Sequence, residues 1–150
     1  MYAFQTQDLE LAEVSSPGDE TREVRAAFPL YHGTGSASTS MVYFELEPEM
    51  HLGSHIDSAE EVLVVLEGEV EATIDGESGR VRAGGMALVP AMVPHDVRNA
   101  GDETAKVAGL FSSNTMVAVF EEEFSMGGMP PSRVNGTPPP EQALAEPQAA

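Results

Sequence analysis

Residues 51–68, HLGSHIDSAEEVLVVLEG, contain the side chains of this sequence best suited to chemistry: two histidines and two adjacent carboxylates ahead of a very apolar run. Imidazole and carboxylate groups together form the ligand mixture favoured by iron, manganese, nickel and zinc. His55, Glu60 and Glu61 are therefore candidate ligands of a divalent transition metal ion. The pattern predicts a metal site at the start of the apolar run.

His51 is a further candidate ligand, but its separation from His55 along the chain limits how both could bind one ion. On a regular strand these two histidines would face the same way but stand about 13 Å apart. Protein nitrogen–metal bonds are only about 2 Å long, so one ion can hold both histidines only if the chain bends at Gly53, where glycine permits it. The alternative is that His51 is a surface histidine beside Glu47 and Glu49.

A second segment, residues 84–99 (GGMALVPAMVPHDVRN), carries another histidine of interest, His95. It follows two prolines that restrict the chain, and alternation places it on the same face as Val97. A lone histidine on an apolar face packs more often than it binds a ligand. Here three of the four histidines fall in two short segments, which favours a shared site. The fourth, His32, lies in a small, polar stretch and is interpreted as a loop histidine.

The elements that would position these side chains are β-strands. Residues 61–67 are β-branched and leucine-rich and end at Gly68, which predicts a buried strand. Asp75-Gly76 is a strong hairpin signal. Further runs separated by turn residues lie at 21–30, 41–47, 69–75, 79–82, 86–90, 95–99, 104–111 and 116–124. About eight core strands at this close spacing predict an all-β sandwich or barrel.

Composition bounds the rest. A length of 150 residues is enough for one domain with a core, expected at 1–125, followed by a proline-rich tail at 126–150 that is extended or disordered. The absence of cysteine excludes disulfides and thiolate sites. A net charge of −18 argues against nucleic acid and membranes as partners, and it fits either a high-salt habitat or a soluble surface. Without a secretory signal in the sequence, the expected location is the cytoplasm.

The motif around His95 resembles the second motif of the cupin superfamily. That motif is a glycine, five residues, a proline, then a histidine and, four positions later, an asparagine. Gly84, Pro90, His95 and Asn99 stand at this spacing, and the sequence departs only at Met92, where the family usually has glycine. The resemblance covers about residues 38–120.

The first motif of the family, His-x-His, three or four residues, Glu, six residues and Gly, is matched less closely. Counting back from Gly68 selects Glu61 as the carboxylate ligand, with Glu60 as the alternative. If His55 is the second histidine, the loop to Glu61 is one residue longer than the pattern and Gly53 replaces the first histidine. Either His51 reaches in across Gly53, or the metal site has three ligands: His55, Glu61 and His95.

The resemblance implies a jelly-roll β-barrel with a metal ion in its mouth, extra N-terminal strands and a homodimeric assembly. One face of strand 61–67 would point into the barrel: Glu61, Leu63 and Val65. The other face would need its own cover: Val62, Val64 and Leu66. The expected pocket lining is Met41, Tyr43, Met86, Val97 and Phe111. Tyr43 and Glu60 are the candidate catalytic proton carriers.

The expected function is that of a metal-dependent enzyme, dioxygenase-like or isomerase-like, acting on a small organic molecule. The rival is a non-catalytic ligand-binding or storage-type protein, because this fold hosts both. The sequence contains no separate DNA-binding module, which argues against a sensor domain of a transcription factor.

Overall fold

The computed structural model describes residues 1–137, which form twelve β-strands and two three-residue 3-10 turns, η1 (Thr6–Asp8) and η2 (His32–Thr34). The predicted all-β class is confirmed. Within these residues no helix is long and apolar enough to cross a membrane. The strands are β1 (Ala12–Ser16), β2 (Asp19–Leu30), β3 (Ser40–Leu46), β4 (His55–Asp57), β5 (Glu61–Glu67), β6 (Glu69–Ile74), β7 (Glu77–Arg82), β8 (Met86–Val89), β9 (His95–Asn99), β10 (Ala105–Phe111), β11 (Val117–Met126) and β12 (Ser132–Gly136).

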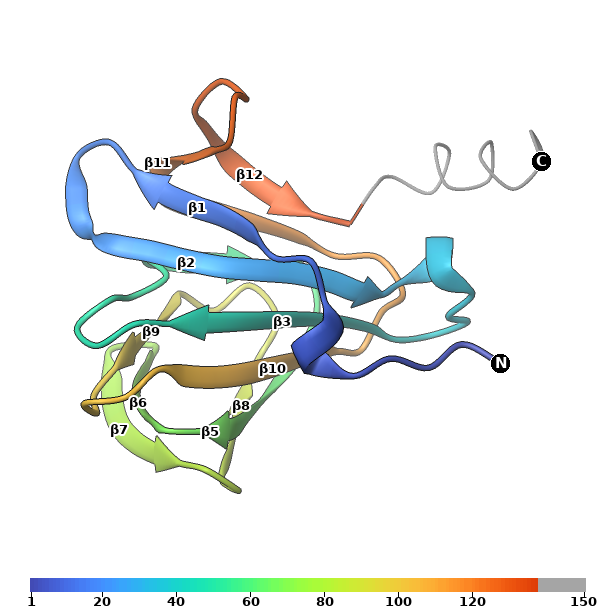
Figure 1. The fold of residues 1–150 in the computed structure, drawn as a ribbon, viewed down its shortest axis with the longest axis horizontal. Coiled ribbons are helices and arrows are strands. Elements are labelled where there is room, and N and C mark those ends of the chain that lie inside the picture. Colours follow the sequence, from blue (N-terminus) through green and yellow to red (C-terminus); the bar gives the residue numbers. More distant parts are fainter. Residues whose placement is uncertain (138–150) are drawn as a thin grey trace.

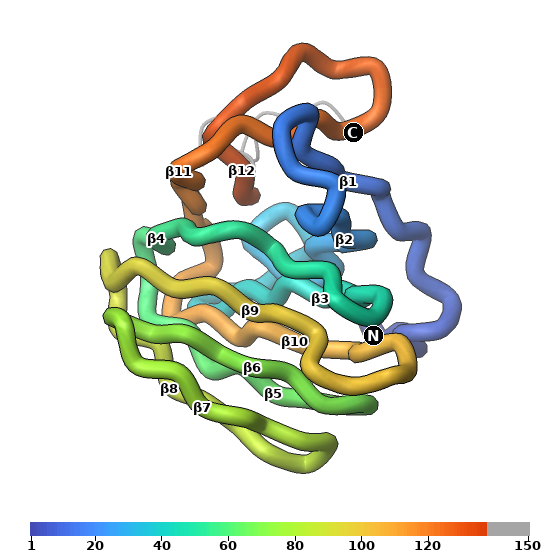
Figure 2. The backbone as a smooth tube through the Cα atoms, turned by 90° about the vertical axis from the view of Figure 1, so that its left-hand side faces the viewer, coloured from blue at the N-terminus to red at the C-terminus, as the bar shows by residue number. Residues whose placement is uncertain are grey.

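All strand pairs are antiparallel, and the sheet runs in the order β7-β6-β9-β4-β11-β1-β2-β3-β10-β5-β8. The sheet curls into a nearly closed barrel, with β2, β3, β10 and β5 in one layer (Figure 1). The tube view shows β4, β9, β6 and β7 in the opposite layer (Figure 2). β11 joins the layers because it pairs with β4 through one part of its length and with β1 through another.

The core lies between the two layers and follows the alternation of the strands. On β5 the inward residues Glu61, Leu63 and Val65 are buried, as the sequence predicts. Leu63 and Val65 pack with inward residues of the neighbouring strands: Val24, Phe44, Leu46, Val70, Val89, Val97, Ala105 and Val107. The predicted hairpin joins β6 to β7, and its residues Asp75 and Gly76 have φ values of 51° and 81°. Positive φ at both central residues is the type I′ turn that suits the twist of a hairpin.

The outer face of β3 and β10 carries a second apolar cluster. Met41, Tyr43 and Ala108 are buried there, and residues of the N-terminal segment and of β2 cover them: Phe4, Leu9, Leu11 and Leu30. Met41 and Tyr43 therefore do not line the pocket, contrary to the expectation from the sequence. Met86, also expected in the pocket, is exposed. Alternation directs Val42 and Phe44 of β3 inward instead.

β12 extends the sheet beyond residue 125, the domain end expected from composition. It pairs with β11 from Val117↔Gly136 to Phe124↔Ser132. The buried Thr137 follows it, and its Oγ1 accepts a hydrogen bond from Met116 N at 2.9 Å. Residues 138–150 of the expected tail lie outside the described part of the chain.

Candidate metal centre

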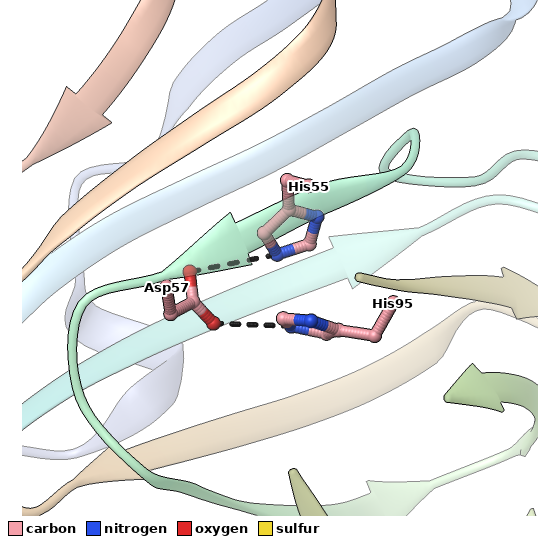
Figure 3. Close-up of side chains that lie close together, drawn as sticks. All are labelled: His55, Asp57 and His95. Carbon is pink, nitrogen blue, oxygen red and sulfur yellow. Dashed lines mark ion pairs between the residues drawn. The ribbon is translucent and has the colours of Figure 1, made fainter. Parts of the chain in front are cut away.

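Two neighbouring strands of one layer bring the candidate ligands together. His55 of β4 and His95 of β9 stand directly opposite each other in the ladder, and their ring centroids are 4.1 Å apart. Asp57 lies two residues after His55, so it shares that residue's face of the strand. The three side chains converge between the layers (Figure 3). We call His55, Asp57 and His95 the metal group.

The distances within the metal group fit one ion. Asp57 Oδ2 lies 3.0 Å from His95 Nε2, and Asp57 Oδ1 lies 3.7 Å from His55 Nε2. One ligand atom from each residue lies within 4.8 Å of the others. Because metal–nitrogen and metal–oxygen bonds are about 2 Å long, ligand atoms of one ion stand roughly 3–4 Å apart. Small adjustments of these side chains would therefore bring all three to one ion.

The hydrogen bonds of His55 and His95 leave the Nε2 atom of each ring available to a metal ion. His55 Nδ1 donates to Gly53 O at 2.8 Å, and His95 Nδ1 donates to Val93 O at 2.9 Å. A backbone acceptor at Nδ1 fixes the ring and leaves Nε2 for a metal ion. His95 Nε2 and Asp57 Oδ2 are buried without an oriented hydrogen-bond partner among residues 1–137. In the metal-free protein these two atoms face each other at 3.0 Å as an ion pair without hydrogen-bond alignment, and the same convergence of imidazole nitrogens and a carboxylate suits a bound metal ion.

Glu61 lies beside the metal group as a further carboxylate. Its Oε1 is 3.4 Å from His95 Nε2, and the residue is buried. Its carboxylate packs against Gly109 of β10, where a Cβ atom would overlap Glu61 Oε2. Burial raises the pKa of Glu61, and the Asp57 carboxylate raises it further, whereas contact with His95 lowers it; the result is about 7. Glu61 can therefore gain or lose a proton near neutral pH.

The two histidines of the metal group differ in charge when no ion is bound. Burial lowers the pKa of His95, but the Asp57 and Glu61 carboxylates raise it more, to about 10. Burial and then the charge on His95 lower the pKa of His55. In the metal-free protein at neutral pH, His95 is therefore a cation beside the Asp57 carboxylate and the partly protonated Glu61, and His55 is neutral.

A small cavity of about 70 Å³ adjoins the metal group. Most of its wall is apolar, and includes Val42, Phe44, Leu63, Val97, Phe111 and Phe120. This volume has room for a few water-sized groups, since one water needs roughly 10–15 Å³ on the same measure. Phe120 stacks on the His55 ring with centroids 4.5 Å apart, and the Arg22 guanidinium lies 5.2 Å from the Phe120 centroid.

The structure brings together three of the predicted ligands, His55, Glu61 and His95, and it directs His51 elsewhere. The chain bends at Gly53, where φ is 99°. His51 Nδ1 lies 2.7 Å from Asp96 Oδ2 and His51 Nε2 lies 3.1 Å from Asp19 Oδ2, so both ring nitrogens face carboxylates outside the metal group.

The two predicted proton carriers also lie away from the metal group. Glu60 is exposed, and its backbone oxygen accepts a hydrogen bond from Ser112 N. Tyr43 is on the outer face of β3, where its hydroxyl donates to Glu45 Oε2 at 2.7 Å. Burial and this hydrogen bond raise the pKa of Tyr43.

Asp57 is the member of the metal group that the sequence analysis did not select. A signal for it was present: His55, one residue, Asp57, three residues, Glu61, six residues, Gly68. This is the spacing of the first motif with an aspartate in place of the second histidine. Assigning His55 to the second position made the loop to Glu61 too long, whereas assigning it to the first position requires no extra residue.

Comparisons with known proteins agree with this geometry. Residues 42–112 match the family described as cupin domain, and comparison with curated proteins found no match. The fold is similar to Lactobacillus farciminis oxalate decarboxylase in its formate complex, with 17% identity, a TM-score of 0.67, and coverage of 79% of this chain and 35% of that one. It is also similar to a Bacillus subtilis oxalate decarboxylase studied for its Mn(II) centres (22% identity, TM-score 0.57, coverage 71% and 30%).

A further similar structure is the cupin domain of Schizosaccharomyces pombe Cnp3, with 14% identity, a TM-score of 0.55, and coverage of 74% of this chain and 73% of that one. The chain spans about a third of the length of the two decarboxylases. At these identities the likeness shows the fold, which is the predicted jelly-roll barrel with extra N-terminal strands.

Proposed function

Residues 42–112 of this chain match the cupin-domain family, and from that match we propose that the protein is a metal-dependent enzyme acting on a small organic molecule in the barrel cavity. The expected chemistry is dioxygenase-like or isomerase-like. The observation that carries the proposal is the convergence of buried metal-ligating atoms, two of them without an oriented hydrogen bond, beside a small apolar cavity.

The ion would be a divalent transition metal such as iron, manganese, nickel or zinc. His55 Nε2, His95 Nε2 and an Asp57 oxygen would hold it, with the Glu61 carboxylate as a fourth ligand. When bound, such an ion supplies Lewis acidity and, for iron or manganese, one-electron chemistry. The Mn(II) centres of the Bacillus subtilis decarboxylase support including manganese.

The chain's own residues have three roles in this proposal. The apolar wall excludes bulk water, which strengthens electrostatic interactions within the cavity. Phe120 packs on His55 and restricts its ring. In the metal-free protein Glu61 holds or releases a proton at its carboxylate near neutral pH, because burial raises its pKa to about 7, and a bound ion would displace that proton. The cavity volume limits the bound molecule to a few non-hydrogen atoms, and the formate complex of the similar decarboxylase supports small carboxylic acids as the first compounds to test.

Metal analysis of protein purified without a histidine tag tests the first part of this proposal. We expect one transition metal ion per chain, which His55→Ala and His95→Ala each remove while circular dichroism remains that of a folded barrel. His32→Ala, outside the metal group, is the matched control. Full metal occupancy in both site variants would refute the site.

Turnover assays test the second part. Oxygen consumption with small carboxylic acids distinguishes a dioxygenase from an isomerase, since only the former uses dioxygen. A ligand that binds to the metal-loaded protein without turnover would instead identify the non-catalytic binding type.

The homodimer expected from the sequence belongs to the proposal as well. The outer residue Val62 of β5 lies between Leu88 of β8 and Leu110 of β10 in the sheet, and both leucines are exposed. The chain's own N-terminal segment covers the neighbouring face of β3 and β10. Exposed apolar faces of this kind favour a second copy as cover. Leu88→Glu should shift the sedimentation coefficient toward that of a monomer, whereas Val134→Glu on β12 should not.

A further inference from the structure

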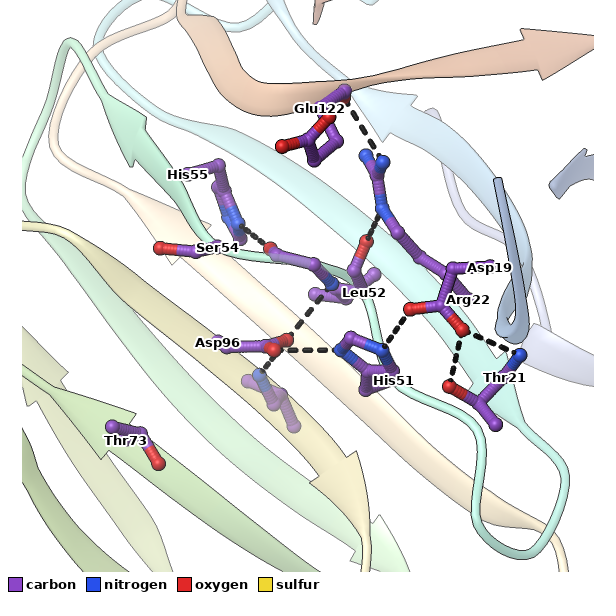
Figure 4. Close-up of polar contacts among 12 residues, drawn as sticks. Asp19, Thr21, Arg22, His51, Leu52, Ser54, His55, Thr73, Asp96 and Glu122 are labelled. Atoms are coloured by element: carbon purple, nitrogen blue, oxygen red, sulfur yellow. Dashed lines mark hydrogen bonds and ion pairs between the residues drawn. The ribbon is translucent and has the colours of Figure 1, made fainter. Parts of the chain in front are cut away.

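A charged cluster on the outer side of β9 connects to the metal group through the backbone. Asp96 follows His95 and therefore points to the opposite face. Asp96 Oδ1 accepts hydrogen bonds from Gly53 N at 2.9 Å and from Val97 N at 2.7 Å. Its other oxygen, Oδ2, lies 2.7 Å from His51 Nδ1 (Figure 4). Asp96 thus joins β9 to the segment that leads into β4.

Two charged side chains hold the peptide bond between Leu52 and Gly53 from opposite sides. Arg22 Nε donates to Leu52 O at 2.8 Å, and Gly53 N donates to Asp96. The Arg22 side chain also occupies the place where a Cβ atom on residue 53 would lie. Hydrogen bonds to ionised groups are stronger than neutral ones, so this peptide is firmly fixed.

The next peptide orients a ligand of the metal group. Gly53 O accepts the hydrogen bond of His55 Nδ1 at 2.8 Å, which determines the ring nitrogen that faces the ion. The direction of this carbonyl depends on the backbone angles at Gly53, where φ is 99°. A change in the peptide that Asp96 holds would therefore turn the acceptor of the His55 ring.

His51 anchors Asp96 to the rest of the barrel. Its Nε2 lies 3.1 Å from Asp19 Oδ2 of β2, and Asp19 Oδ1 accepts hydrogen bonds from Thr21 N and Thr21 Oγ1. Both ring nitrogens of His51 therefore face carboxylates, Nδ1 toward Asp96 and Nε2 toward Asp19, and neither faces the metal group.

We infer that Asp96 is a positioning residue for the metal group, acting on His55 through Gly53, and that His51 supports Asp96 in this role. This inference rests on the proposed metal-dependent function. Direct hydrogen-bond partners of ligating histidines typically contribute about 10–100-fold in metal affinity, and Asp96 acts one peptide further from the ring, which places its effect at the lower end of that range.

Metal affinity of four variants tests the inference. Chelator-treated protein is titrated with Mn²⁺ or Zn²⁺, and we expect Asp96→Ala to weaken binding about tenfold. Asp96→Asn keeps the shape and one acceptor oxygen, so it should lose less; it also decides the test if the alanine variant does not fold. His51→Gln should weaken binding in the same direction. Asp102→Asn, in an exposed turn, is the matched control and should bind as the parent does.

The nitrogen-15 spectrum of the His55 ring separates positioning from a merely structural role. In metal-free parent protein we expect the hydrogen on Nδ1, held by Gly53 O, and in Asp96→Ala a mixture of both tautomers. A structural role alone would lower the melting temperature with and without metal while leaving the dissociation constant and the tautomer unchanged, and that result would overturn the inference. If the parent binds no metal, the proposed function fails, but the tautomer measurement still decides whether Asp96 orients His55.

Discussion

Metal binding should depend steeply on pH, because the ion must displace a proton from His95. The carboxylates of Asp57 and Glu61 raise the pKa of His95 to about 10, against the opposing effect of burial. A pH of 7 is therefore about three units below the pKa of His95. At roughly 1.4 kcal/mol per unit, removing the proton from His95 at this pH costs about 4 kcal/mol. Since the ion and the proton compete for the same Nε2 atom, affinity should rise with pH, about tenfold per unit between pH 7.5 and 9.

Below pH 7 the ion should have to displace a second proton, from Glu61. The pKa of Glu61 is raised to about 7, chiefly by burial, so this group is mostly protonated at pH 6.5. A cation beside it favours the ionised form. The dependence should therefore be steeper there, approaching two protons displaced per ion.

Calorimetric titration of the metal-free protein measures these protons directly. Repeating the titration in buffers of different ionisation enthalpy should give about one proton released at pH 8 and between one and two at pH 6.5. Glu61→Gln should remove the additional proton at pH 6.5 and leave the one from His95. Equal affinity at both pH values, with no proton released, would show that His95 is neutral before metal binds and would refute the reasoning.

Three further predictions concern single side chains. Asp57→Asn should weaken metal binding and reduce proton release at pH 8, because it removes both a ligand and the charge that holds the His95 proton; calorimetry checks both. Gly109→Ala should destabilise the protein by about 1–3 kcal/mol in urea unfolding, since its methyl group would displace the Glu61 carboxylate, whereas Gly79→Ala, with open space at its Cβ position, should have little effect. Met92→Gly should stabilise by up to about 1 kcal/mol, because Met92 is exposed with φ at 64°, whereas Ala91→Gly should destabilise slightly.

The sequence alone was sufficient for those features that depend on short-range patterns. The resemblance that selected Glu61 as a ligand predicted which face of β5 is buried, and Asp75-Gly76 predicted the hairpin that joins β6 to β7. The resemblance of residues 84–99 to the second cupin motif identified His95 and implied the fold. It also marked Met92 as the position where glycine is usual, and there the chain has a left-handed conformation. These features depend on local backbone geometry, which neighbouring residues largely determine.

Such patterns could not predict the three-residue strand β4. His55–Asp57 is too short and too polar to show alternation, and it forms a strand only because β9 and β11 pair with it. The loop predicted here hid the fact that Asp57 shares a face with His55. The direction of His51 likewise depends on Asp19 and Asp96, which are 32 and 45 residues away along the chain.

Tertiary structure also determined which face of β3 lines the cavity. Both faces of this strand are apolar, so the sequence did not distinguish Val42 and Phe44 from Met41 and Tyr43. Docking of the N-terminal segment on the outer face decided between them. In the same way, the register that sets His55 opposite His95 arises from pairing between distant segments, and a slip of one residue would turn one histidine to the outer face. The sequence therefore determined the residue types available to the metal group, and long-range strand pairing determined which of them meet.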